Sequence, residues 1–307
     1  MSNKTELLAS MKRAEARLGG SHGTHENRRK TIIGFVAFVC KRKYTHLKDI
    51  RHVRGRYVKE FIIMRLDSGV NKRTLQNEMA HFRMLWRASG LHAVANATEL
   101  SNKALGIDGA PRGGKKVAIS DEQFYACCKT AVETGRHGIS LLLRLQHALG
   151  LRANEAICAN LDTLLDWKRC VDAKAVHVYL TRGAKTGRPR WIEIQDHILL
   201  QNLLTEAVTL ASKQSGYLIL RANGKGAGGL KQAQTIYRDW CYYHGFQSHA
   251  LRYAWAQNRY RKLASEGIRE KEILRRLAIG LGHGESRHYY VKSVYLKGMQ
   301  MTFESSD

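Results

Sequence analysis

The segment Ser248–Lys297 reads SHALRYAWAQNRYRKLASEGIREKEILRRLAIGLGHGESRHYYVKSVYLK. It holds His249 and Arg252 in an H-x-x-R pattern, then Leu281-Gly282-His283, and then a cluster of tyrosines. Residues three apart lie on one face of a helix, where an imidazole and a guanidinium can meet the same anionic group. Taken alone, this pattern is more often the polar face of an ordinary helix, so its meaning depends on what accompanies it.

Two upstream segments accompany it. Arg152 lies in LGLRANEA, and Lys185 lies in the glycine-containing turn RGAKTG. Arginine, lysine, H-x-x-R, G-H and tyrosine, in this order, resemble the tyrosine recombinase (phage integrase) family. The resemblance is strong from about Leu149 onward and weaker before it. It implies DNA cleavage through a covalent 3′-phosphotyrosine, followed by rejoining within a homotetramer on two double-stranded DNA sites, without ATP, metal or other cofactor.

The resemblance implies roles for the charged residues. Arg152 and Arg252 would bind the scissile phosphate, because guanidinium groups hold phosphate oxygens bidentately and stay charged near neutral pH. His249 and His283 would hydrogen-bond the phosphate or help to remove the proton of the nucleophile. Glu155, one helical turn after Arg152, is expected to orient that arginine.

Lys185 occupies the position of the family's hairpin lysine, which is the general acid for the departing 5′-oxygen. Neighbouring arginines can lower the pKa of such a lysine. An ordinary exposed turn lysine is the alternative, and Arg182, Arg188 and Arg190 are nearby substitutes.

The spacing of the family does not identify the nucleophile here, since Lys292 stands where the family usually has its tyrosine. We favour Tyr295, because Val294-Tyr295-Leu296 resembles the short helix that presents the family's nucleophile, and rank Tyr290 second; Tyr289 is also near. A tyrosine packed in the core is the remaining interpretation. The segment between Arg252 and His283 is also longer than usual, with an addition on each side of Gly267, which indicates a divergent branch.

Composition agrees with a DNA partner. The chain has 307 residues, 44% of them hydrophobic, and 51 Lys and Arg against 26 Asp and Glu give a net charge of +25. Such an excess indicates a polyanionic partner. The longest apolar stretch, Ile32–Cys40, is too short to span a membrane, and the start lacks the apolar core of a signal peptide. We therefore expect a cytoplasmic protein without a membrane partner.

The six cysteines form no C-x-x-C pair, and the fourteen histidines show no metal-ligand spacing. We expect reduced thiols and no structural metal.

Residues 1–106 are predicted to form a helical bundle, with Thr24 and Asn71 as N-caps, that resembles the SAM-like core-binding domain of the family. Exposed basic side chains are expected to contact backbone phosphates. These are Arg28, Arg29, Lys30, Arg42, Lys43, Lys72 and Arg73 in the bundle, and Arg188 and Arg190 farther along.

Residues 107–118 are predicted to be a linker, and 119–307 a catalytic domain. Its predicted helices cover Ser120 to about Thr134, Ile139–Leu149, Ile198–Ser212 and Gly229–Tyr243, with a hairpin of Val176–Thr181 and Arg190–Ile194. The segment Gly224–Gly229 lacks the ending of a P-loop and is interpreted as a flexible loop. The predicted fold is mainly α with a small antiparallel β-sheet, in a two-domain DNA clamp of tyrosine recombinase type.

The sequence thus favours a site-specific recombinase or integrase of a mobile genetic element. Its rivals are a type IB topoisomerase-like DNA relaxase, a chromosome-dimer resolving recombinase, and a noncatalytic DNA-binding or regulatory protein derived from a recombinase. The intact arginine, lysine and histidine pattern argues against a noncatalytic protein. The absence of a tyrosine at the family's usual position, where Lys292 stands, favours a noncatalytic protein.

Overall fold

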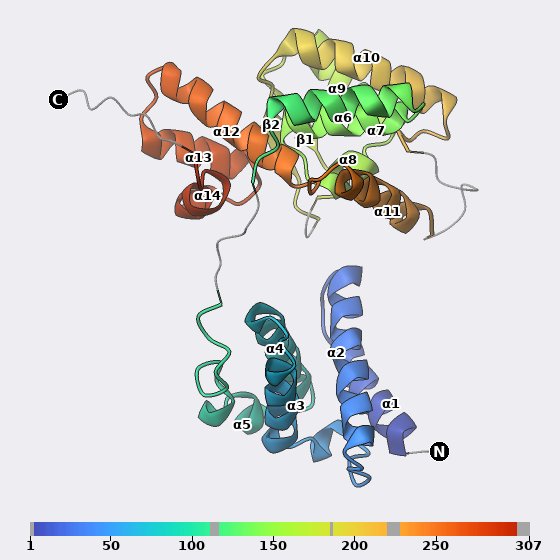
Figure 1. Cartoon of the computed structure of the whole chain (residues 1–307), viewed down its shortest axis with the longest axis vertical. Helices are drawn as coiled ribbons and strands as arrows, with labels where there is room; N and C mark the ends of the chain where they lie inside the picture. Colours follow the sequence, from blue (N-terminus) through green and yellow to red (C-terminus); the bar gives the residue numbers. More distant parts are fainter. Residues whose placement is uncertain (1–2, 111–116, 185–186, 220–227, 300–307) are drawn as a thin grey trace, which may run out of the picture. The chain divides into compact units, whose positions relative to one another are not determined.

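The computed structural model describes residues 3–110, 117–184, 187–219 and 228–299. The chain divides into two compact units, Met1–Arg112 and Gly113–Asp307 (Figure 1). Among the described residues the fold is mainly helical, with one two-stranded antiparallel sheet, which confirms the predicted fold class. Residues 111–116 of the predicted linker, and most of the predicted loop at 224–229, lie outside the described residues.

The first unit is a helical bundle around an aromatic core. Its main helices are α1 (Asn3–Ala16), α2 (His22–Lys41), α3 (Gly55–Asp67), α4 (Lys72–Ala88) and the short α5 (His92–Ala95). Phe35, Phe61 and Phe82 meet edge to face at this core. Helix α1 was not predicted separately, and it is held to α2 by the fully buried Leu7 and Met11.

Two of the predicted helix starts can be compared directly with the structure. Asn71 caps α4 as predicted, since its side chain accepts a hydrogen bond from the Arg73 N–H at 2.8 Å. The prediction of Thr24 as the cap of α2 was wrong. The chain turns into the helix earlier, so that Ser21 Oγ accepts from the Thr24 N–H and Thr24 itself lies in the first turn.

The second unit carries the remaining elements. Its helices are α6 (Asp121–Glu133), α7 (His137–Leu149), α8 (Ala153–Cys158), α9 (Leu161–Asp172), α10 (His197–Lys213), α11 (Gly228–Tyr243), α12 (Ala250–Ser265), α13 (Glu270–Gly280) and α14 (His288–Tyr295). Strand β1 (His177–Leu180) pairs with β2 (Arg190–Glu193), with Val178 opposite Ile192. The predicted helices and hairpin are all present, within a few residues of their expected ends.

Helix α7 is the central helix of the larger core of this unit. Ile139, Leu142 and Leu145 are among its many buried residues, and it packs against α6, α8, α10 and α12. A smaller core joins α12, α13 and α14, which are grouped together in orange and red in Figure 1. Tyr253 and Tyr295 stack inside it with ring centroids 4.6 Å apart. This packing brings the end of α14 against the start of α12.

None of the described helices is both long and apolar enough to cross a bilayer.

Candidate active site

The hydroxyl of Tyr295 lies where three of the predicted site residues meet. It is 3.0 Å from His283 Nε2, 3.4 Å from His249 Nε2, and 3.4 Å from Arg252 Nε, which donates to it. Tyr295 ends α14, whereas His249 is the N-cap of α12 and Arg252 lies on its first turn. The H-x-x-R spacing therefore places an imidazole and a guanidinium at one helix end, and the packing of α14 adds the phenol.

Arg252 is completely buried, and its guanidinium is held by the backbone. Its Nη1 donates to the carbonyl of Gly150 and its Nη2 to the carbonyl of Leu281. Burial lowers the pKa of Arg252 to about 10, and the neighbouring Arg152 and Arg190 act in the same direction. The group remains protonated at neutral pH, so the phenol faces a fixed positive charge.

Arg152 approaches the same point from α8. It is the N-cap of that helix, and its Nη2 donates to the carbonyl of Leu281 at 3.1 Å. Arg152 and Arg252 therefore share one acceptor, which directly precedes the Gly282-His283 motif. Two guanidinium groups that share one oxygen are close enough to bind the oxygens of a single phosphate.

Glu155 is fully buried and contacts both Arg152 and Arg190. It accepts from the Arg152 N–H at 2.7 Å, from Arg152 Nη1 at 2.6 Å, and from both terminal nitrogens of Arg190 at 2.6 and 2.7 Å. Burial alone would raise the pKa of Glu155. The hydrogen bonds and charge of Arg190, the Arg152 N–H and the charge of Arg252 outweigh burial and hold this pKa at about 2. These are the contacts expected of a carboxylate that orients Arg152.

Arg190, predicted as a DNA contact or as a substitute for Lys185, does not have the exposed side chain that either role requires. Its side chain is only 8% exposed, because it provides the buried Glu155 with a counter-charge. Its Nε also donates to the carbonyl of Gly280 at 3.0 Å, so Arg190 joins strand β2 to α8 and to the end of α13. The two-residue alternation of buried and exposed side chains along β2 could have predicted this burial from the sequence. Arg190 lies on the inward face with Ile192, whereas Trp191 points outward.

Lys185 lies outside the described residues. The beginning of its turn is described, and it lies against α8: the Gly183 carbonyl accepts from Asn154 Nδ2 at 3.1 Å. A side chain at Gly183 would collide with the backbone of Asn154 and Glu155. The turn thus begins beside the helix that carries Arg152 and Glu155.

The other tyrosines of α14 are placed differently. Tyr289 is 75% exposed and Tyr290 is 38% exposed. The ring of Tyr290 lies edge to face on His283, with centroids 5.1 Å apart, and burial raises its pKa. Tyr295 is the tyrosine whose hydroxyl contacts both histidines and Arg252.

The predicted DNA-contacting residues of the first unit are exposed, with one exception. Arg29, Lys30, Arg42, Lys43, Lys72 and Arg73, and Arg188 in the second unit, are all exposed. The prediction for Arg28 was wrong, because Arg28 is only 3% exposed. Its Nη1 donates to the carbonyl of Gly19 at 2.9 Å and lies 3.8 Å from the buried Glu15 carboxylate. Among the described residues, no group of three or more His, Cys, Asp or Glu could hold a metal ion.

Comparison with known proteins gives family matches in both units. A family model described as "Phage integrase, N-terminal" matches residues 4–95, and one described as "Integrase" matches residues 106–258. No curated protein gives a significant sequence match. His283 and Tyr295 lie beyond the second match, so the family comparison does not assign them a role.

Solved structures of integrases share the fold. A lambda integrase dimer bound to a COC′ core site has a TM-score of 0.61 at 15% identity, covering 97% of this chain and 79% of that one. The Tn1549 transposon integrase in complex with transposon right end DNA has a TM-score of 0.59 at 14% identity, covering 99% and 96%. A lambda integrase tetramer bound to a Holliday junction has a TM-score of 0.58 at 14% identity, covering 98% and 79%. The two family matches, which together cover most of the chain, show that it belongs to the tyrosine recombinase (phage integrase) family, and the shared fold agrees with them.

Proposed function

We propose that the protein is a site-specific DNA recombinase that cleaves and rejoins DNA through a covalent 3′-phosphotyrosine at Tyr295. The observation that carries this proposal is the position of the Tyr295 hydroxyl, within 3.4 Å of His249, Arg252 and His283. A phenol becomes a nucleophile when a neighbouring base accepts its proton and a cation stabilises the phenolate. The two imidazoles and the buried guanidinium provide these functions.

In the proposed reaction, the Tyr295 oxygen attacks the scissile phosphorus while its proton passes to His249 or His283. The new bond joins the phenol oxygen to phosphorus, and the bond from phosphorus to the 5′-oxygen breaks. The departing 5′-oxygen takes a proton from Lys185. Attack of another 5′-hydroxyl on the phosphotyrosine reverses these steps, and the stored bond energy makes ATP unnecessary.

Arg152 and Arg252 would neutralise the charge that develops on the non-bridging oxygens. In the DNA-free chain both donate to the Leu281 carbonyl. Arg152 is the more accessible of the two, with 19% of its side chain exposed. We therefore expect the phosphate to contact Arg152 first. It would then replace the Leu281 carbonyl as the acceptor of the hydrogen bonds from Arg152 Nη2 and Arg252 Nη2.

The partner that we propose is double-stranded DNA. The support is the net charge of +25, the exposed basic residues of both units, and the DNA present in the lambda and Tn1549 integrase structures. Assembly as a homotetramer on paired sites is proposed by analogy with the lambda integrase tetramer. Integration or excision of a mobile genetic element is the process that we infer.

The test is covalent capture on a pool of nicked suicide duplexes with randomised sequence, so that the target site need not be known. Denaturant-resistant protein–DNA adducts are isolated, the DNA is sequenced, and the modified peptide is identified by mass spectrometry. We expect an adduct on Tyr295, lost in Tyr295→Phe and kept in the matched control Tyr290→Phe.

An adduct on Tyr290 would overturn the assignment of Tyr295. DNA binding without any adduct would support the noncatalytic reading. Relaxation of supercoiled plasmid by single-strand cleavage, without strand exchange between selected sites, would support the topoisomerase-like reading.

A further inference from the structure

Arg190, the first residue of β2, contacts both of the segments that form the proposed phosphate site. Its terminal nitrogens donate to the two oxygens of Glu155 on α8, and its Nε donates to the carbonyl of Gly280 at the end of α13. A Cβ atom at Gly282 would lie 2.9 Å from Arg190 Cδ, so the arginine side chain also packs against that glycine. Because Arg190 is buried, any part that it has in the reaction is exercised through these neighbours.

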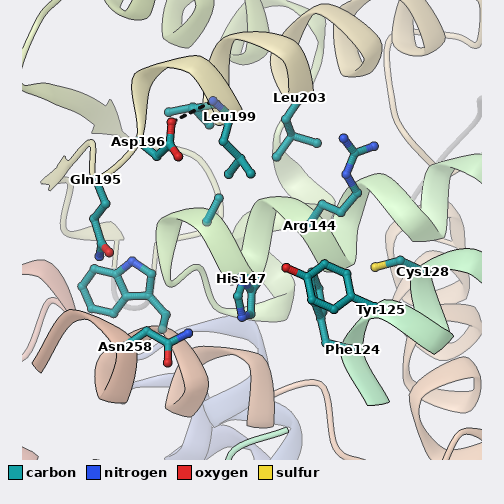
Figure 2. A pocket seen from close by; sticks show the side chains of 13 residues that line it. Phe124, Tyr125, Cys128, Arg144, His147, Gln195, Asp196, Leu199, Leu203 and Asn258 are labelled. Atoms are coloured by element: carbon teal, nitrogen blue, oxygen red, sulfur yellow. Dashed lines mark hydrogen bonds between the residues drawn. The ribbon is translucent and has the colours of Figure 1, made fainter. Parts of the chain in front are cut away.

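The first consequence concerns the charge of Arg152. Taken alone, Arg152 and Glu155 would form a one-to-one ion pair without net charge. Among the described residues, Arg144 of α7, seen at the pocket in Figure 2, forms such a pair: both of its terminal nitrogens donate to Glu206, at 2.5 and 2.8 Å. Glu155 is instead shared between Arg152 and Arg190, so this group of three keeps a net charge of +1. The positive charge that a phosphate requires is therefore retained.

The hydrogen bonds at Glu155 are divided between the two arginines. Arg190 binds one carboxylate oxygen with each of its terminal nitrogens, whereas Arg152 uses its backbone N–H and Nη1. The Nη2 of Arg152 reaches the Leu281 carbonyl instead. A bidentate pair of arginine and carboxylate has a fixed geometry, so Arg190 fixes the carboxylate on which Arg152 is oriented.

The other contacts of Arg190 fix the turn after α13. Gly280 and Gly282 flank Leu281, whose carbonyl accepts from both of the arginines that we expect to bind phosphate. Arg190 contacts each of these two glycines, so the position of the carbonyl depends on it. Its charge also reaches the deeper of the two arginines: burial lowers the pKa of Arg252, and the charge of Arg190 acts in the same direction.

We propose that Arg190 is a positioning residue for the phosphate site, an inference that rests on the proposed function of that site. By holding Glu155, it orients Arg152 without letting the carboxylate neutralise it. By holding Gly280 and Gly282, it places the turn that both phosphate-binding arginines contact. Loss of Arg190 would give the buried carboxylate a single arginine as hydrogen-bonded partner, so Arg152 would be drawn into a neutral pair and would bind phosphate more weakly.

The first test measures phosphate binding by the full chain without DNA, so it does not depend on recombination. The protein is labelled with ¹⁵N-arginine, and Arg152→Lys identifies the Nε–H signal of Arg152 by its disappearance from the NMR spectrum. Inorganic phosphate, added at constant pH and ionic strength, should shift this signal in a saturable manner in the wild type. In Arg190→Gln we expect half-saturation to require at least about fivefold more phosphate.

A double variant separates this charge effect from a loss of structure. In Glu155→Gln/Arg190→Gln the carboxylate that would neutralise Arg152 is removed as well, so phosphate should bind more tightly than it does to Arg190→Gln. A purely structural role predicts no such recovery, because the double variant has lost more of the buried contacts. The matched control is Arg259→Gln, which removes another buried arginine, the partner of Glu193 at the other end of β2, and should leave phosphate binding unchanged.

Arg190→Lys provides the test if Arg190→Gln does not fold. Lysine keeps the charge but cannot bind both oxygens of Glu155 in the fixed geometry of a guanidinium, so we expect at least about threefold weaker phosphate binding. In the covalent capture assay, the Arg190 variants should slow adduct formation about tenfold or more, as expected when a binding group is displaced.

Four results would overturn the proposal: no phosphate-dependent shift of the Arg152 signal in the wild type, unchanged phosphate binding in the folded Arg190 variant, no recovery in the double variant, or an equal loss in Arg259→Gln. Phosphate binding that follows our expectations, without any adduct in the wild type, would support the positioning role and contradict recombination. Failure of the proposed function is thereby distinguished from failure of this inference.

Discussion

Replacement of Glu155 by glutamine tests whether this buried carboxylate holds the arginines in place. The pKa of Glu155 falls from its usual 4.5 to about 2 in the folded chain. One pKa unit corresponds to about 1.4 kcal/mol, so ionisation of the carboxylate, net of the cost of its burial, contributes about 3 kcal/mol of stability at neutral pH. Because the variant also leaves Arg190 buried without its counter-charge, we expect Glu155→Gln to cost about 3–5 kcal/mol.

The pH dependence gives a second, sharper expectation. Since the folded-state pKa is depressed, the carboxylate stabilises the fold above its unfolded pKa of about 4.5, and this contribution is lost as the pH falls towards 2. The difference in unfolding free energy between wild type and Glu155→Gln should therefore narrow by about 2 kcal/mol between pH 7 and pH 3.

Urea unfolding followed by tryptophan fluorescence measures this difference. Four of the five tryptophans lie in the second unit, so the signal reports mainly on the unit that contains Glu155. The matched control is Glu206→Gln, which breaks the exposed pair with Arg144 and should cost no more than about 1 kcal/mol. The reasoning would be refuted if Glu155→Gln lowered the unfolding free energy no more than Glu206→Gln does. It would also be refuted if the difference in unfolding free energy between wild type and Glu155→Gln did not change with pH.

Three further predictions concern the site and its partner. Gly150→Ala should lower the melting temperature more than Gly135→Ala. Both glycines have a positive φ, +60° at Gly150 and +69° at Gly135, but only at Gly150 would the new Cβ collide with a side chain, the indole of Trp255. Arg152→Lys should reduce covalent adduct formation at least about tenfold, because lysine cannot bind phosphate bidentately, and near-normal adduct formation would contradict the shared-phosphate geometry. Affinity for nonspecific DNA, measured by fluorescence anisotropy, should fall steeply as salt rises, and a flat response would remove the argument from net charge.

Much of the fold followed from local sequence patterns. Leu75, Met79, Phe82 and Trp86 repeat at helical spacing and are all fully buried in α4, and Asn71 caps that helix as expected. These features depend on residues within a few positions of one another, where helix geometry and capping chemistry act directly. The small sheet was predictable for the same reason, because a turn and two short β-prone runs are adjacent in the chain.

Part of the site was also local. His249 and Arg252 share one helix end because they are three residues apart, and Glu155 reaches Arg152 within a single turn. The sequence by itself thus determined which residue types could form the site and which of them are neighbours along a helix.

Only the tertiary structure decided which tyrosine meets them and which basic residues are buried. Tyr295, rather than Tyr290, has its hydroxyl within 3.4 Å of His249 and Arg252 because α14 packs on α12, through contacts that join residues more than forty positions apart. Arg28 and Arg190 are buried because Glu15 and Glu155, on other elements, compensate their charge. The exposure of a charged side chain depends on the partner that the fold brings to it, and no spacing along the chain encodes that partner.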